Sequence, residues 1–268
     1  MQSEKWVPAG IDVERPSAAR IYDYQLGGSH NFAVDRQVGE QMVALHPEVP
    51  RMAQANRAFL RRAVQYLVDA GVRQFLDVGS GIPTAGHVHE IAQRSAPEAR
   101  VVYVDVDPVA VAHSRQILAG NPRTAAVQED VRHPEQILDA AEVHELLDLD
   151  QPVGVLVVAL FHFIPDADDP AGILARLTAP LASGSALVLS HATDDEQSDA
   201  DEAREIYRRS GIDLTLRSRA QVTALFGDID LVEPGVVWVP QWRPESARDL
   251  YHDRPEASAG YAGVGRKR

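Results

Sequence analysis

Two glycines follow directly after a short apolar run and can bring a ligand close to the backbone. The run 74–78 has the residue types of a β-strand, and Gly79 and Gly81 come between it and a helical pattern over 84–94. Glycine lets the chain turn sharply into a helix and lets a ligand approach main-chain N–H groups. We therefore expect a ligand-binding loop here, made of Asp77, Gly79, Ser80 and Gly81.

Acidic residues also stand at the ends of the next two predicted strands. Asp105 follows the apolar run 100–104, where a carboxylate can accept hydrogen bonds from both hydroxyls of a ribose. Asp130 follows the weaker run 125–127 and is placed to accept a hydrogen bond from an adenine amino group. Asp77, ahead of the glycines, can attract a positively charged group. Three acids at three strand ends predict a nucleoside ligand with a cationic portion.

The residues after Gly81 argue against a dinucleotide. The dinucleotide fingerprint has a third glycine at the position of Thr84, and Pro83 removes a backbone N–H where a pyrophosphate collects several. A ligand with a ribose but without a phosphate fits better, and S-adenosylmethionine is the one that we expect. A nicotinamide-dependent oxidoreductase is a less favoured alternative.

Two of the ten histidines follow core strands at their carboxyl ends, where open α/β sheets bind ligands. These are His162 and His191, and either imidazole can act as a general base near pH 7 or can simply bond to the end of its strand. His87 and His89 stand two apart on a predicted helix and face different ways, no HExxH pattern occurs, and the chain has no cysteine. We therefore expect catalytic candidates at His162 and His191 and no metal site.

The spacing of strands and helices predicts an α/β fold. Strand-like runs alternate with helical patterns from about residue 74, as in βαβ units. We expect a Rossmann-like, doubly wound, mostly parallel seven-stranded sheet with a C-terminal antiparallel hairpin and a helical N-terminal extension. The predicted strands are 74–78, 100–104, 125–127, 152–161, 185–190, 229–232 and 236–239.

Three regions follow from this pattern. Residues 1–70 form a helical extension that ends in an amphipathic helix over 51–70, residues 71–244 form the ligand-binding domain, and residues 245–268 form a flexible tail rich in Pro, Ala and Gly. The extension is polar and aromatic around Tyr22, Tyr24, Gly28, His30 and Asn31. We expect this segment to close over the ligand as a lid, with a plain structural cap as the alternative.

The composition is that of a globular protein with an acidic balance. The chain has 268 residues, 45% of them hydrophobic and 24% charged, with 39 Asp+Glu against 26 Lys+Arg and a formal charge of -13. An acidic surface disfavours tight binding to nucleic acid. The most apolar run, 153–164, is too short to cross a membrane, and the first residues lack the apolar stretch of a signal peptide. Together with the lack of cysteine, these features predict a cytoplasmic protein that acts on a small molecule, with its oligomeric state left open.

A longer set of motifs resembles the actinobacterial S-adenosyl methyltransferase family over about residues 16–244. The matching segments are Pro16-Ser17-Ala18-Ala19-Arg20-Ile21-Tyr22-Asp23-Tyr24, Leu26-Gly27-Gly28, Asn31-Phe32, Asp35-Arg36, Phe75-Leu76-Asp77-Val78-Gly79-Ser80-Gly81-Ile82-Pro83-Thr84, Val102-Tyr103-Val104-Asp105, Leu160-Phe161-His162-Phe163, Leu189-Ser190-His191, Pro234-Gly235-Val236 and Pro240-Gln241-Trp242-Arg243-Pro244.

The resemblance implies a class I methyltransferase fold that binds S-adenosylmethionine, and it does not name the methyl acceptor. After the fourth strand the chain reads Ala159-Leu160-Phe161-His162, without the Asp/Asn-Pro-Pro-Tyr pattern of enzymes that methylate exocyclic or amide nitrogens. An acceptor of the DNA-adenine or glutamine kind is therefore disfavoured.

These observations together predict an S-adenosylmethionine-dependent methyltransferase that acts on a small molecule without a metal. The alternative is a protein that holds S-adenosylmethionine or its demethylated product as a sensor, without turnover. The predicted cofactor-binding residues are Asp77, Gly79, Ser80, Gly81, Thr84, Asp105, Val106, Asp130, Val131, Ala159, Tyr22, Tyr24, Gly28, His30 and Asn31.

Overall fold

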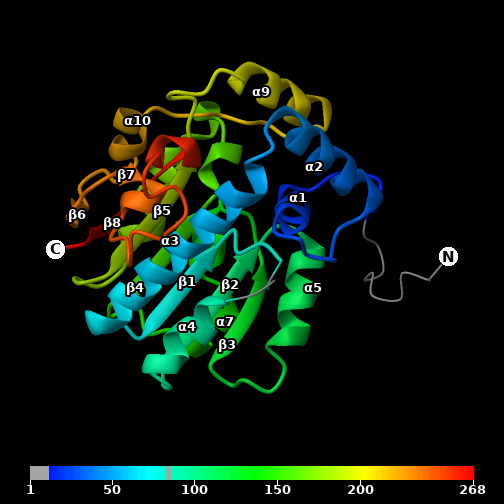
Figure 1. Ribbon diagram of the computed structural model, residues 1–268. Helices are drawn as coiled ribbons and strands as arrows, with labels where there is room; N and C mark the ends of the chain where they lie inside the picture. The colour runs from blue at the N-terminus through cyan, green and yellow to red at the C-terminus, as the bar shows by residue number, and fades with distance from the viewer. Residues whose placement is uncertain (1–11, 83–85) are drawn as a thin grey trace.

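The computed structural model describes residues 12–82 and 86–268, and one mixed sheet with helices on both faces forms its centre (Figure 1). The strand order is β3-β2-β1-β4-β5-β8-β6, and β7 also pairs with β8. Strands β1 to β5 are parallel, whereas β8 runs antiparallel to its neighbours. The strands are β1 (Gln74–Val78), β2 (Arg100–Asp105), β3 (Thr124–Gln128), β4 (Val153–Val158), β5 (Ala186–Ala192), β6 (Asp230–Leu231), β7 (Val237–Trp238) and β8 (Gly260–Arg266).

The expected Rossmann-like, mostly parallel α/β fold is thus confirmed, with a different arrangement at its antiparallel edge. The runs 229–232 and 236–239 were expected to pair with each other as a hairpin. In the structure β6 and β7 each pair with β8, which makes eight strands in the sheet.

The central strands are apolar on both faces because both faces are covered by helices. Successive side chains alternate between two separate apolar clusters: Phe75 faces one and Leu76 the other. Helices α3 (Val49–Asp69), α4 (Val88–Ser95) and α5 (Pro108–Ile117) contribute to the first cluster. Helices α6 (Pro134–Leu138), α7 (Ala141–Leu146), α8 (Pro170–Thr178) and α10 (Arg219–Ala224) contribute to the second.

Three of these helices begin at the capping residues that the sequence indicates. The Asp107 carboxylate accepts hydrogen bonds from two main-chain N–H groups in the first turn of α5. Asp169 accepts one from Gly172 at the start of α8, and Ser218 accepts one from Gln221 at the start of α10. Each cap satisfies N–H groups that a helix start would otherwise leave unpaired.

Helix α3 packs directly on the sheet, although the sequence analysis assigned it to the extension before residue 71. Its buried side chains Phe59, Val64 and Leu67 share one apolar cluster with sheet residues such as Phe75. The amphipathic stripe of α3 is therefore buried against the sheet, and the helix could not leave it without exposing this surface to water.

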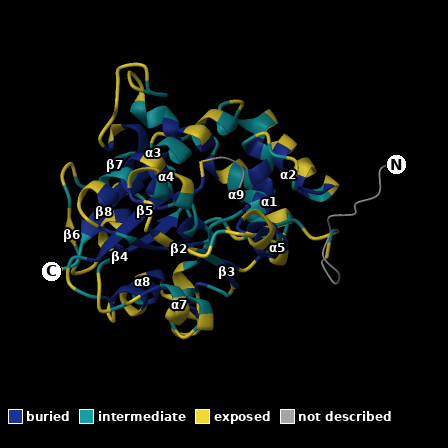
Figure 2. Ribbon diagram, turned by 90° about the horizontal axis from the view of Figure 1, so that it is seen from below, coloured by how far each residue is buried: buried dark blue, intermediate teal, exposed yellow. Residues whose placement is uncertain are grey.

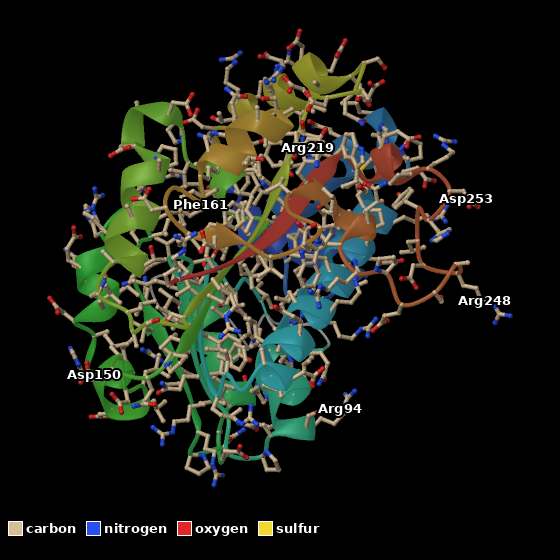
Figure 3. All side chains as sticks on the ribbon, turned by 90° about the vertical axis from the view of Figure 1, so that its left-hand side faces the viewer. Arg94, Asp150, Phe161, Arg219, Arg248 and Asp253 are labelled. Carbon is tan, nitrogen blue, oxygen red and sulfur yellow. The ribbon has the colours of Figure 1, made fainter. Side chains whose placement is uncertain are left out.

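Helices α1 (Ala18–Gln25), α2 (Ala33–Leu45) and α9 (Ala200–Arg209) gather together at one end of the sheet (Figure 1). Their contact is a small apolar cluster that includes Ile21, Met42 and Tyr207. Figure 2 shows the strands buried in the interior and the exposed residues on the outer sides of the helices and loops. The same contrast is seen among the labelled side chains of Figure 3, where Phe161 lies inside the molecule and Arg94 and Asp150 lie at its edge.

The C-terminal segment corrects the expectation of a flexible tail over 245–268. Its last part is β8, whose residues 260–265 are all buried and which pairs with β5 along its whole length. Lys267 then donates hydrogen bonds to the carbonyl oxygens of Thr178, Ala179 and Leu181 after α8. The end of the chain is therefore an internal part of the sheet.

The glycines of β8 explain why its sequence does not look like a strand. A Cβ atom on Gly265 would lie 2.6 Å from Ile229 Cγ2, and one on Gly263 would lie 3.1 Å from Phe226 Cζ and from Val236 Cγ2. These side chains pack directly on the β8 backbone. The glycines are thus required by the neighbouring elements, although they lower strand propensity.

Val264→Ala tests whether β8 contributes to stability. Val264 is fully buried in the sheet, so its truncation should lower the free energy of unfolding by about 1–3 kcal/mol. Leu231→Ala, at a residue of β6 that is 36% exposed, is the control and should cost much less. Chemical denaturation measures both, and an unchanged midpoint for Val264→Ala would show that the segment is loosely held.

Candidate functional site

Two cavities lie side by side at the carboxyl ends of the parallel strands. The first has a volume of about 240 Å³ and is bounded by the loops after β1, β2, β3 and β4 and by parts of α1 and α3. The second has a volume of about 200 Å³ and lies among α1, the ends of β4 and β5, α9 and the first two turns of α3. Both are lined by the same five residues where they meet, namely Ala18, Tyr22, Asn56, Ala159 and Phe163.

The loop after β1 forms one wall of the first cavity, as the glycines indicate. Gly79 and Gly81 have φ of +70° and +65°, a backbone conformation that favours glycine. Gly79 and Ser80 donate their main-chain N–H groups to the carbonyl oxygen of Val104, which anchors the loop to β2. A Cβ atom on Gly81 would meet nothing within 4 Å, so this part of the backbone faces open space.

Asp105 lies at the end of β2, beside this loop, and is only 7% exposed. One of its carboxylate oxygens accepts a hydrogen bond of 2.7 Å from the main-chain N–H of Gly81, and the other accepts one of 2.8 Å from Asp107. Burial raises the pKa of Asp105 to about 6, against the lowering effect of these N–H donors. The carboxylate is therefore rigidly held at the cavity, with lone pairs left for a ligand.

Asp77 and Arg57 bring opposite charges to the first cavity. Burial raises the pKa of Asp77 to about 7, the positive charge of Arg57 lowers it, and Asp105 raises it further. Arg57 lies on α3 and donates a hydrogen bond of 2.9 Å to the carbonyl oxygen of Gly86. The sequence analysis did not identify Arg57 because nothing in a helical stripe shows which neighbouring strand end an arginine will face.

The far side of the first cavity carries the residues after β2 and β3. Val106 is 58% exposed, which is unusual for valine, and Val131 is buried beside it along the cavity wall. Asp130 also lines this wall, as expected. Its carboxylate accepts hydrogen bonds from Arg132 of 2.9 Å and 2.5 Å, and its pKa is lowered because these bonds outweigh the effect of burial. Its bond to an adenine amino group stays a prediction.

The N-terminal segment contributes less to the cavities than the sequence suggests. Of its five predicted residues, Tyr22 lines both cavities, while Tyr24, Gly28, His30 and Asn31 line neither. Thr84, the remaining predicted residue of the glycine loop, lies outside the described residues. Among the described residues 16–32, the segment therefore contributes Ser17 and residues of α1 to the cavity walls.

The four residues that lie away from the cavities shape the turn before α2. Asp23 accepts hydrogen bonds from the main-chain N–H of His30 and the side-chain amide of Asn31, at 2.9 Å and 2.8 Å. A Cβ atom on Gly28 would lie 2.0 Å from the same carboxylate, so a larger residue would have to displace the Asp23 side chain. Tyr24 packs in the same way over Gly39 of α2. Their hydrogen bonds and packing shape this part of the fold, and their contact with the cofactor stays a prediction.

A buried arginine holds α1 against the strand ends. Arg20 is 4% exposed, and its guanidinium lies 3.3 Å from Asp107, the cap of α5, and 3.5 Å from Asp35 of α2. Asp35 in turn accepts hydrogen bonds from the main-chain N–H groups of Ser17 and Phe32. This cluster joins α1, α2 and α5 next to the first cavity.

A chain of hydrogen bonds crosses the place where the cavities meet. Asn56 donates a hydrogen bond of 3.0 Å to the Tyr22 hydroxyl, which donates to the carbonyl oxygen of Ala53. Ser190 donates one of 2.6 Å to the Asn56 side chain and accepts one from the main-chain N–H of Ala159. Ala159 has φ of +57°, so the chain turns sharply at the end of β4. Asn56 and Ser190 are further residues that the sequence analysis did not identify.

His191 lies at the end of β5 but is held on both ring nitrogens. Nδ1 lies 2.6 Å from the carbonyl oxygen of Ala192, and Nε2 lies 2.8 Å from the guanidinium of Arg217. A carbonyl only accepts and a guanidinium only donates, so Nδ1 carries the proton and the lone pair of Nε2 is used. The prediction of a general base at His191 is therefore wrong, and this imidazole connects Arg217 to the sheet.

His162 lines the second cavity and not the first, and its expected place near an acceptor stays a prediction. Its Nδ1 lies 3.4 Å from the main-chain N–H of Ala192, which leaves the proton on Nε2. Burial, with the nearby His191 and Arg217, lowers the pKa of His162 well below its usual range. The lowered pKa favours a neutral ring that takes part in hydrogen bonds, and a role of His162 in proton transfer stays a prediction.

The comparison with known families identifies the class of protein. The S-adenosyl methyltransferase family model matches residues 4–268. The matching family is one of S-adenosylmethionine-dependent methyltransferases. The chain belongs to the S-adenosyl methyltransferase family, and its cofactor is S-adenosylmethionine.

Two crystal structures are similar along nearly the whole chain. A candidate methyltransferase from Thermobifida fusca is 37% identical, with a TM-score of 0.92 over 98% of this chain and 99% of that chain. A DUF574 family protein from Streptomyces avermitilis is 42% identical, with a TM-score of 0.92 over 96% of this chain and 99% of that chain.

More distant similarities support the fold and nothing further. An O-methyltransferase family protein from Burkholderia thailandensis is 12% identical, with a TM-score of 0.54 over 91% of this chain and 63% of that chain. None of the curated proteins compared with the sequence matches it. None of the described helices is long and apolar enough to span a membrane.

The raised pKa of Asp77 predicts that cofactor affinity depends on pH. The cationic S-adenosylmethionine favours the ionised carboxylate, so below a pKa of about 7 binding must first displace a proton. Affinity should fall about ten-fold from about pH 8 to about pH 6, as measured by calorimetry. Asp105, with a pKa of about 6, adds to this effect only at the acidic end.

Asp77→Asn is the matching variant and should bind more weakly with little pH dependence. Asp228→Asn, at an exposed carboxyl outside both cavities, should keep the wild-type profile. A profile that is the same in wild type and Asp77→Asn would show that another group binds the proton.

Proposed function

We propose that the protein transfers a methyl group from S-adenosylmethionine in the first cavity to a small-molecule acceptor in the second. The observation that carries this proposal is that the two cavities meet at Tyr22, Asn56 and Ala159, where a methyl group could pass from one to the other without crossing solvent. Proximity and orientation alone can supply much of the rate enhancement for such a transfer.

The residues of the first cavity fit the three parts of the cofactor. Asp105 would accept hydrogen bonds from the ribose hydroxyls, and Val106 and Val131 would cover the adenine. Asp77 and Arg57 would hold the ammonium and the carboxylate of the methionine portion, which need opposite charges. When bound, the cofactor supplies an electrophilic methyl group on a sulfonium.

The chain's own contribution is to bind, orient and exclude water. The bonded chain Tyr22–Asn56–Ser190 keeps the wall rigid where the acceptor's reacting atom would lie. Burial raises the pKa of Tyr22, so its hydroxyl stays protonated and keeps its donor role. The acceptor would contribute the electron pair of its new bond to carbon, the pair of the broken sulfur–carbon bond would stay on sulfur, and the acceptor's proton would pass to water.

The test uses S-adenosylmethionine with an isotopically labelled methyl group and a panel of small-molecule acceptors. Mass spectrometry should find S-adenosylhomocysteine and an equal amount of labelled product. Tight cofactor binding without transfer to any acceptor would instead support the sensor function.

Asp105→Asn tests the ribose contact. This substitution keeps the shape of the side chain but removes an acceptor oxygen and the charge. It should weaken S-adenosylhomocysteine binding by about 1.5–3 kcal/mol, the usual range for hydrogen bonds to a charged group. Calorimetry on the folded variant is the measurement, and an unchanged dissociation constant would refute the assignment.

His162→Ala tests the role of the neutral imidazole in the second cavity. Because His162 would orient the acceptor and not the cofactor, kcat/KM for the acceptor should fall about ten-fold while S-adenosylhomocysteine affinity stays within about three-fold. His162→Gln, which keeps an N–H donor, should recover part of the loss. With its lowered pKa, His162 should give no inflection between about pH 6 and about pH 8. A wild-type inflection in that range that is absent from His162→Gln would identify it as a general base.

A further inference from the structure

We propose that the second cavity selects an uncharged, largely apolar acceptor that carries a hydroxyl group and extends about 10 Å toward the mouth of the cavity. This inference rests on the proposed function and names the class of molecule that the second cavity takes. It follows from the helix that lines the cavity, the polar groups at its two ends, and its charge.

Helix α3 lines the cavity along one face. Val49, Met52, Ala53 and Asn56 follow each other at the i, i+3, i+4, i+7 spacing of a single helical face, and all four line the second cavity. The seven steps from Val49 to Asn56 span about 10 Å at the rise of an α-helix. The cavity therefore extends about this far from the place where it meets the first cavity.

The walls between its ends are mostly apolar. Met42 and Leu45 come from α2, Ala203 from α9, and Leu214 and Leu216 from the segment after α9. These side chains cannot satisfy a polar group, so the body of the acceptor must be apolar as well.

The inner end has the hydrogen-bonding pattern of a hydroxyl. The Asn56 amide donates one N–H to the Tyr22 hydroxyl and accepts one hydrogen bond from Ser190. Counting its bonds to described residues, one N–H and one lone pair of the amide remain for a ligand. A hydroxyl group both donates and accepts. The Nε2–H of the neutral His162, on the same cavity, is a further donor for its oxygen.

The outer end carries a hydrogen-bonded pair of side chains, His46 just after α2 and Asp199 just before α9. His46 Nδ1 lies 2.8 Å from Asp199 Oδ2, and these two side chains are 31% and 25% exposed. Both line the second cavity, at the N-terminal end of α3. They form a polar mouth beyond the apolar walls.

The charges of the cavity disfavour an anionic acceptor. Asp199 brings a carboxylate to the mouth, and among the described residues that line the second cavity there is no lysine or arginine. Arg57 lines the first cavity but not the second. A carboxylate or phosphate bound here would lose its hydration without gaining a lysine or arginine partner.

Three probes with one ring system and different polar groups test this class: 2-naphthol, 2-naphthoate and 2-naphthyl phosphate. Each is titrated by calorimetry into the full chain saturated with S-adenosylhomocysteine, which fills the first cavity. 2-Naphthol should bind at least about ten-fold more tightly than either anion.

Met52→Lys supplies the missing cation in the wall of the second cavity. This variant should bind 2-naphthol more weakly. The ratio of 2-naphthol affinity to 2-naphthoate affinity should fall about ten-fold. Gln54→Lys, on an exposed position of the same helix outside both cavities, is the matched control and should leave both affinities within about two-fold.

Tighter or equal binding of the anions, binding of none of the three probes, or equal effects of the two lysine variants would overturn the proposed acceptor class. If S-adenosylhomocysteine still binds in those cases, the proposed methyltransferase function is retained and the acceptor belongs to another class of molecule. Failure of S-adenosylhomocysteine to bind would instead overturn the proposed function.

Discussion

The buried contact of the Arg20 guanidinium with Asp107 and Asp35 holds α1 in place, and α1 forms part of the wall of both cavities. The guanidinium lies between Asp107, which caps α5, and Asp35, which shapes the start of α2. Asp107 also donates its main-chain N–H to Asp105, so one positive charge connects α1 to the end of β2. Removing one member of such a buried set typically costs about 3–5 kcal/mol, because the remaining charges stay in a poorly hydrated place. Helix α1, and with it Tyr22, is therefore held firmly where the two cavities meet.

The two cavities differ in the kind of side chain that each presents. The first combines buried carboxyls at two strand ends with Arg57, and burial keeps the pKa values of Asp77 and Asp105 high until a charged ligand compensates them. The second is mostly apolar, with polar groups at its inner end and its mouth. This division matches a reaction in which a charged cofactor and an apolar acceptor must meet at one point.

The sequence predicted the fold and the first cavity well. The runs that became β1 to β5 are apolar, short and regularly spaced, and glycines or acids follow β1, β2 and β3, so local pattern and final position agree. The structure does not bring all of the predicted N-terminal residues to the cavities. The main-chain N–H of His30 and the side-chain amide of Asn31 donate to the Asp23 carboxylate a few residues away. A residue type alone does not show whether its partner is a ligand or the chain itself.

The sequence by itself determined the class of fold, the glycine loop and the acids at the strand ends, because these depend on residues close together in the chain. Only the tertiary structure decided the role of β8, since its glycines are required by Phe226, Val236 and Ile229, which lie far away in sequence. The same is true of Asn56 and Arg57, which are ordinary residues of a helical stripe until α3 packs against the sheet. It is also true of His162 and His191, whose proton positions depend on Ala192 and Arg217. Burial and long-range partners set the chemistry of these side chains, and neither can be deduced from neighbours in the sequence.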